Sequence, residues 1–147
     1  MDQYWTGASG VVVLFKGKDF CIKKVKRVIG GRLLCIDVEW HQLKFRIINV
    51  YCPPDLNERL EVLKEIQPLL VCGSDVILGG DFNCLMDKKD RMTVATVRLD
   101  SSSEMLNNLI KDFKLNDTFR YKNPNTPGYT WSNEKTETKD ILALIHT

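Results

Sequence analysis

The sequence of 147 residues contains no apolar run near the ~20 residues of a membrane span, and no signal peptide leads it. Its five cysteines are odd in number and include no Cys-x-x-Cys pair, which argues against a disulfide framework and a zinc site. Repeats, low-complexity segments and linkers are also missing. The net charge of +2 excludes a polycation, so any nucleic-acid contact must come from local patches. These absences predict one intracellular domain over residues 1–147, nuclear or cytoplasmic and not bound to a membrane.

The stretch at residues 76–83 combines a short apolar run, two glycines and two polar residues. The run is typical of a strand buried on both faces, and the glycines would let another backbone or a ligand approach closely. If the chain is still extended beyond them, Asp81 and Asn83 share one face about 7 Å apart, while Phe82 points into the core. A carboxylate and a carboxamide so placed could seat a phosphate and an activated water. The alternative is a strand that ends in a turn, since Gly, Asp and Asn are common turn residues.

The hydrophobic pattern elsewhere predicts alternating strands. Strands 34–40 and 43–51 are expected to form a hairpin, and Cys52-Pro53-Pro54 ends the second of them. The remaining extended segments are expected at 10–15 (a buried strand), 21–28, 76–83, 115–120 and 129–132.

Two helices are predicted between these strands. Asp55 and Glu58 have capping-box spacing at the first, and Ser101 and Glu104 have it at the second. The first helix carries one apolar stripe, made of Leu56, Leu60, Leu63, Ile66 and Leu70. The order strand, helix, strand predicts that 43–51 and 76–83 are parallel neighbours in one sheet.

Basic residues are concentrated near the N-terminus, where seven of them and one acid lie from Lys16 to Arg32. Such a patch could meet a phosphate backbone. The preferred interpretation is a solvated edge strand protected by lysines.

Several landmarks occur in one order along the chain, and together they resemble the endonuclease domain of non-LTR (LINE-type) retrotransposons, in the exonuclease–endonuclease–phosphatase superfamily. The resemblance runs from about Ser9 to Ser132. Gly-Gly-Asp-Phe-Asn at 79–83 is moderately specific, whereas the ordered set is highly specific. Its landmarks are Ser-Gly-Val-Val-Val-Leu-Phe at 9–15, Gly31-Arg32-Leu33, Asn49-Val50-Tyr51 with Pro53, residues 79–83, Asp90-Arg91, Leu115-Asn116-Asp117 with Phe119-Arg120, Asn123-Pro124, and Tyr129-Thr130-Trp131-Ser132.

The resemblance implies a two-sheet α/β sandwich, like DNase I and AP endonucleases, and Mg²⁺-dependent hydrolysis of a DNA phosphodiester. It assigns Tyr51 to contact the scissile phosphate and Asp81 to orient or deprotonate the attacking water. Asn83 would hydrogen-bond the phosphate as charge builds up. Thr130 would lie near the DNA-facing rim, and Asp140 would replace the aspartate of the family's Ser-Arg-Ile-Asp motif after a one-residue deletion.

The family pattern is not complete in this sequence. A first strand with an asparagine, the glutamate that chiefly holds the metal, and a terminal Asp-His pair have no counterpart, since His146 follows no aspartate. The metal ligands are therefore unknown. We expect an incomplete sandwich truncated at both ends, impaired nicking, and self-association through uncovered sheet edges.

Two alternative functions remain. The first is a catalytically dead remnant that acts as a nucleic-acid or protein-binding module. The second is a phosphoinositide or nucleotide phosphatase, against which stand the retrotransposon-type spacing and the lack of a second basic cluster near Asp81 in the sequence.

Overall fold

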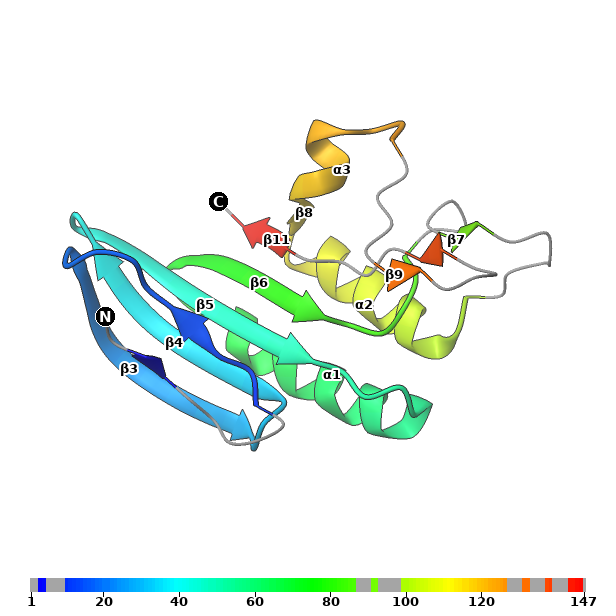
Figure 1. Ribbon diagram of the computed structural model, residues 1–147, viewed down its shortest axis with the longest axis horizontal. Coiled ribbons are helices and arrows are strands. Elements are labelled where there is room, and N and C mark those ends of the chain that lie inside the picture. The colour runs from blue at the N-terminus through cyan, green and yellow to red at the C-terminus, as the bar shows by residue number, and fades with distance from the viewer. Residues whose placement is uncertain are drawn as a thin grey trace.

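The computed structural model describes residues 3–4, 10–86, 91–92, 99–126, 131–132, 137–138 and 143–146, with side chains in 10–86 and 99–126. Its main feature is a six-stranded sheet in the order β3-β4-β5-β6-β11-β8 (Figure 1). These strands are β3 (Phe20–Ile29), β4 (Leu33–Trp40), β5 (Leu43–Tyr51), β6 (Asp75–Asp81), β8 (Asn116–Asp117) and β11 (Ala143–His146). Three helices accompany them, α1 (Leu56–Leu70), α2 (Ser101–Asp112) and α3 (Thr118–Lys122).

Two smaller sheets lie beside the main one. The first pairs β1 (Gln3–Tyr4) with β2 (Val13–Leu14), and the second joins β7 (Arg91–Met92), β10 (Glu137–Thr138) and β9 (Trp131–Ser132). The described residues thus confirm a mixed α/β fold, of which they form one large sheet and only part of a sandwich.

The strand pairing follows the predicted order. β4 and β5 form the expected antiparallel hairpin, whose turn residues His41 and Gln42 have φ of 48° and 69°. Two consecutive positive φ values suit a two-residue hairpin, because their twist matches that of the strands. β5 and β6, joined through α1, are parallel as predicted. β3 is an edge strand with its lysines in solvent, and Lys23 Nζ lies 3.3 Å from Glu39 Oε2.

Helices α1 and α2 cover one face of the sheet. Their apolar side chains pack with alternate residues of β4, β5 and β6, such as Ile48, Val50 and Leu78. Phe82 is fully buried in the same core, which confirms its predicted inward direction. On the opposite face, Val11 and Phe15 cover a second apolar cluster made by Leu34, Ile36 and Val38.

The start of α1 confirms the predicted cap, since Asp55 Oδ1 accepts the Glu58 backbone N–H at 3.0 Å. Its far end is held to the sheet by Arg46, which donates to both carboxylate oxygens of Asp37 and to the carbonyl of Leu69. The Arg46 hydrogen bond, opposed by partial burial, lowers the pKa of Asp37 below its ordinary value. This bidentate pair therefore stays charged at neutral pH and fixes the helix on the sheet.

Three local predictions were wrong in whole or in part. Within 10–15 only Val13–Leu14 forms a strand, and Leu14 is exposed rather than buried, because the segment crosses the second face instead of joining the sheet. The extended piece at 115–120 turns helical at Thr118, because Asp117 Oδ1 caps the Arg120 N–H. The apolar stripe of α1 is confirmed at Leu63, Ile66 and Leu70, but Leu56 at its start is exposed, and Val62 is buried beside it.

Among the helices that the structure describes, none combines the length and the apolar character needed to cross a bilayer.

Candidate functional site

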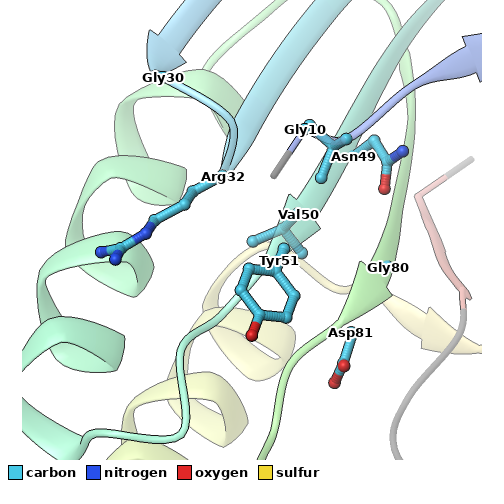
Figure 2. A pocket seen from close by; sticks show the side chains of 9 residues that line it. Gly10, Gly30, Arg32, Asn49, Val50, Tyr51, Gly80 and Asp81 are labelled. Atoms are coloured by element: carbon cyan, nitrogen blue, oxygen red, sulfur yellow. The ribbon is translucent and has the colours of Figure 1, made fainter. Parts of the chain in front are cut away.

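The parallel pairing of β5 and β6 places Tyr51 directly beside Asp81. Adjacent strands lie about 4.8 Å apart, and directly opposed residues of parallel strands point to the same face. Both side chains therefore project from the sheet face that is opposite to α1, at the last residue of each strand. Figure 2 shows the phenol and the carboxylate pointing in the same direction from neighbouring strand ends.

Gly80 makes this arrangement possible. Its φ is +134°, and a Cβ built at this position would lie 1.9 Å from the carbonyl oxygen of Val50. Only glycine can bring the backbone of β6 so close to that of β5 without a clash. The predicted close approach is confirmed, and the backbone that approaches is that of Val50.

Tyr51 and Asp81 line one cleft of about 760 Å³. Gly30 and Arg32, from the connection between β3 and β4, form another part of its wall, as does Asn49 of β5. Tyr51 is 36% exposed and Asp81 is also exposed, so water and a large ligand can reach both groups. The cleft thus offers a phenol and a carboxylate to solvent within one hollow of the surface.

Arg32 brings a positive charge to this cleft, but its guanidinium is turned toward α1 (Figure 2). Its Nη2 lies 2.7 Å from Glu58 Oε2, and both side chains are partly exposed. An ion pair of this kind contributes about 0–1 kcal/mol, so a phosphate could compete for the arginine.

Asn83 does not continue the alternation of β6. The strand ends at Asp81, and Asn83 has φ of 48°, which corrects the expectation of a shared extended face. The Asn83 N–H donates to Asp81 Oδ1 at 3.0 Å, forming an Asx turn. Its side-chain Nδ2 donates to the carbonyl of Cys52 at 2.7 Å, so the amide lies against the end of β5. Asn83 is not part of the cleft wall but adjoins it through its hydrogen bond to Asp81, and its predicted phosphate contact stays a prediction.

Cys52 is buried directly behind Tyr51. Burial, the neighbouring Cys84 thiol and Asp81 raise its pKa to about 12, although Arg59 opposes the shift. The thiol is therefore neutral at physiological pH, which is typical of a structural cysteine.

The sequence prediction missed a buried charged residue below the site, Arg59 of α1, which is 6% exposed. It also placed the start of α2 one residue too late, since Asp100 is the N-cap and accepts the N–H groups of Ser102 and Ser103. The sequence contains a signal for each feature. The arginine stands at helical spacing from Val62 and Ile66, which indicates a buried position, and the aspartate directly precedes three serines, which indicates an N-cap.

The fit to Mg²⁺ is weak in the part of the chain that the structure describes. There, no group of three or more His, Cys, Asp or Glu side chains could hold a metal ion. Asp81 supplies one carboxylate to the cleft, which is the fewest that Mg²⁺ takes, and the remaining ligands would be waters and a substrate phosphate. These residues do not form a metal site on their own. The predicted residues Thr130 and Asp140 lie outside the described residues.

No family model matches the sequence. The chain is 34% identical over 131 residues to the Transposon TX1 uncharacterized 149 kDa protein of Xenopus laevis, covering 86% of this chain and 10% of that protein. It thus spans about a tenth of the length of the curated relative that it matches.

Solved structures show the same fold. The endonuclease domain of TRAS1, a telomere-specific non-LTR retrotransposon, matches with a TM-score of 0.68 and 13% identity, over 97% of this chain and 65% of that one. An AP endonuclease from Archaeoglobus fulgidus matches with a TM-score of 0.66 and 14% identity, over 97% of this chain and 65% of its own. The transposon relative and the shared fold confirm the resemblance to the endonuclease domains of non-LTR retrotransposons: the chain is homologous to a part of the transposon TX1 protein and has the fold of the TRAS1 and AP endonuclease structures.

Proposed function

We propose that the chain binds DNA across the cleft at Tyr51 and Asp81 and hydrolyses one phosphodiester of one strand. The observation that carries the proposal is the register that sets these two side chains together at the open ends of parallel strands. Ligands of open α/β sheets bind at the carboxyl ends of the strands. The proposal includes the expectation that the large sheet is one layer of a two-sheet sandwich.

In this proposal water attacks the phosphorus in line with the leaving sugar oxygen. Asp81 accepts a hydrogen bond from that water and takes its proton, which raises the nucleophilicity of the oxygen. The Tyr51 hydroxyl donates to a non-bridging oxygen of the phosphate, where negative charge accumulates in the transition state. Asn83 has a second side-chain N–H besides the one that holds Cys52, and this donor would serve the same oxygen.

Arg32 would bind a neighbouring phosphate of the strand after leaving Glu58. Magnesium, when bound together with the phosphate, would supply charge neutralisation. Because only Asp81 among the described cleft residues has a carboxylate, we expect slow nicking that rises with Mg²⁺ concentration into the millimolar range.

The test is nicking of supercoiled plasmid DNA, with Mg²⁺ and with EDTA. Tyr51→Phe should lower the nicking rate by about 10–100-fold, because it removes one hydrogen bond to a charged group worth about 1.5–3 kcal/mol. The matched control is Tyr121→Phe on α3, since Tyr121 is 82% exposed and far along the chain from the cleft. Equal rates for the Tyr51 and Tyr121 variants would contradict the assignment of Tyr51.

The scarcity of carboxylates favours one second candidate, a DNA-binding module without catalysis. Under that alternative the protein retains plasmid DNA in a mobility-shift assay, and nicking in Mg²⁺ equals nicking in EDTA. Nicking that requires Mg²⁺ and is lost in Tyr51→Phe would exclude it.

A further inference from the structure

Arg59 is a charged residue in the buried stripe of α1. It is 6% exposed and stands one turn before Val62 and Leu63, which are fully buried in the main core. A buried guanidinium is costly unless every donor is satisfied. The hydrogen-bond partners of the Arg59 guanidinium therefore indicate the role of this residue.

The guanidinium joins three segments that are far apart in the sequence. Nη1 donates to the carbonyl of Asn83 at 2.7 Å and to that of Pro54 at 3.2 Å. Nε donates to Ser102 Oγ at 2.9 Å, and Nη2 donates to Asp100 Oδ2 at 2.7 Å. One side chain thus ties the segment after β5, the segment after β6 and the first turn of α2 together.

Asp100 is itself held in place by α2. Its Oδ1 accepts the backbone N–H groups of Ser102 and Ser103 at 3.0 and 3.1 Å, which leaves Oδ2 for Arg59. Burial alone would raise the pKa of Asp100, but hydrogen bonds from both serines and the charge of Arg59 lower it below the ordinary value. The pair is therefore ionised at neutral pH, and no buried side-chain polar atom among the described residues lacks a partner.

The contact with Asn83 connects this cluster to the cleft. Asn83 has a left-handed backbone, its N–H donates to Asp81 Oδ1, and its side chain donates to the Cys52 carbonyl. Holding the Asn83 carbonyl thus fixes the rotation of the peptide that follows the turn. The charged Nη1 donor binds that carbonyl more strongly than a neutral donor would.

We propose that Arg59 is a positioning residue that holds the Asp81–Asn83 turn from beneath, so that Asp81 and the Asn83 amide keep one orientation toward the DNA. This inference rests on the proposed function for its catalytic consequence, although the hold on the turn can be measured without catalysis. A merely structural arginine would stabilise α1 and α2 but would leave the turn unchanged when it is replaced in a protein that still folds.

The test compares Arg59→Lys with Ser102→Ala. Lysine keeps the charge near Asp100 but cannot reach Asn83 and Asp100 together, since it is a single point donor on a flexible stem. Ser102→Ala removes a different contact of the same guanidinium and the hydrogen bond that the Ser102 hydroxyl donates to Asp100, both on the α2 side, and leaves the Asn83 contact intact. Circular dichroism below the melting temperature selects conditions in which both variants are folded.

In ¹H–¹⁵N NMR spectra, Arg59→Lys should move the backbone and side-chain amide signals of Asn83 toward the positions of an unstructured chain, while those of Ile48 and Leu78 stay in place. Its kcat for nicking in Mg²⁺ should fall about 10–100-fold, as expected for a misplaced catalytic group, with KM changed less than about threefold. Ser102→Ala should leave the Asn83 signals and kcat close to those of the unchanged protein.

Unchanged Asn83 signals in folded Arg59→Lys would overturn the inference, and so would an unchanged kcat. If the unchanged protein does not nick DNA at all, the proposed function fails, and the Asn83 signals still decide whether Arg59 holds the turn.

Discussion

Gly80→Ala is expected to destabilise the folded protein by more than about 3 kcal/mol, because a new Cβ meets backbone atoms that cannot move aside. The Cβ would lie 1.9 Å from the Val50 carbonyl oxygen and 2.8 Å from two further backbone atoms of Val50, at a φ of +134° that L residues rarely adopt. Relief requires β6 to separate from β5, which would disrupt the parallel pairing at the site. Urea unfolding followed by circular dichroism measures the effect.

Gly73→Ala is the matched control for this substitution. A Cβ at Gly73 meets no atom within 4 Å, and its φ is not in the left-handed region. Its urea midpoint should therefore lie close to that of the unchanged protein or slightly above it, since alanine restricts the unfolded chain. Equal midpoints for Gly80→Ala and Gly73→Ala would show that the two strands are not packed as closely as described.

Asp81→Asn is expected to lower the nicking rate by about 10²–10⁴-fold if Asp81 is the general base. The amide keeps the shape of the side chain and one acceptor oxygen for the Asn83 N–H, so the turn should survive. It cannot accept the proton of water. The rate is best measured in a chimera that adds the segments of the TRAS1 endonuclease domain not spanned by this chain, because the additional site residues should raise nicking well above background.

The control for Asp81→Asn is Asp75→Asn at the other end of the same strand. Asp75 is also exposed, and six residues of β6 place it about 20 Å from Asp81. Nicking by the Asp75 variant should equal that of the unchanged chimera. A chimera that nicks equally well with Asp81→Asn would show that Asp81 is not the catalytic group.

Tyr51 and Asp81 could be placed from the sequence because strand order and motif order agree. The helix between residues 43–51 and 76–83 predicted that these two strands are parallel. Parallel strands that are aligned residue by residue end at the same edge of the sheet. The glycine pair predicted close packing of backbones. None of these inferences required knowledge of a distant contact, which explains why they match the observed register.

The position of Asn83 could not be predicted in the same way. Alternation along a strand holds only while the backbone stays extended, and the left-handed φ of Asn83 ends it one residue after Phe82. The choice between strand and turn is decided by hydrogen bonds to Asp81 and to Cys52, and the second of these comes from a segment 31 residues away. A local pattern contains no information about such a partner.

Arg59 was missed because an apolar periodicity counts only apolar residues. The stripe through Leu56 and Leu60 fitted helical spacing, yet the buried side of α1 runs through Arg59 and Val62. The carbonyl acceptor of Asn83 and the carboxylate acceptor of Asp100 compensate the burial of this charge. A charged residue at helical spacing within a buried stripe is thus a signal for a polar cluster.

The central claim is that DNA binds at the cleft of Tyr51 and Asp81, and its most direct test is a ¹H–¹⁵N NMR titration of the chain with a short DNA duplex in Mg²⁺. The amide signals of Tyr51, Asp81 and Arg32 should shift with one saturable curve, and the shifts should weaken as salt is raised, because phosphate contacts release counterions. The backbone amide signals of the lysines in β3 should shift less. If the shifts gather instead at Lys24 and Lys26 while the signals of Tyr51 and Asp81 stay unchanged, the edge strand is the DNA-binding surface and the account of the cleft is wrong.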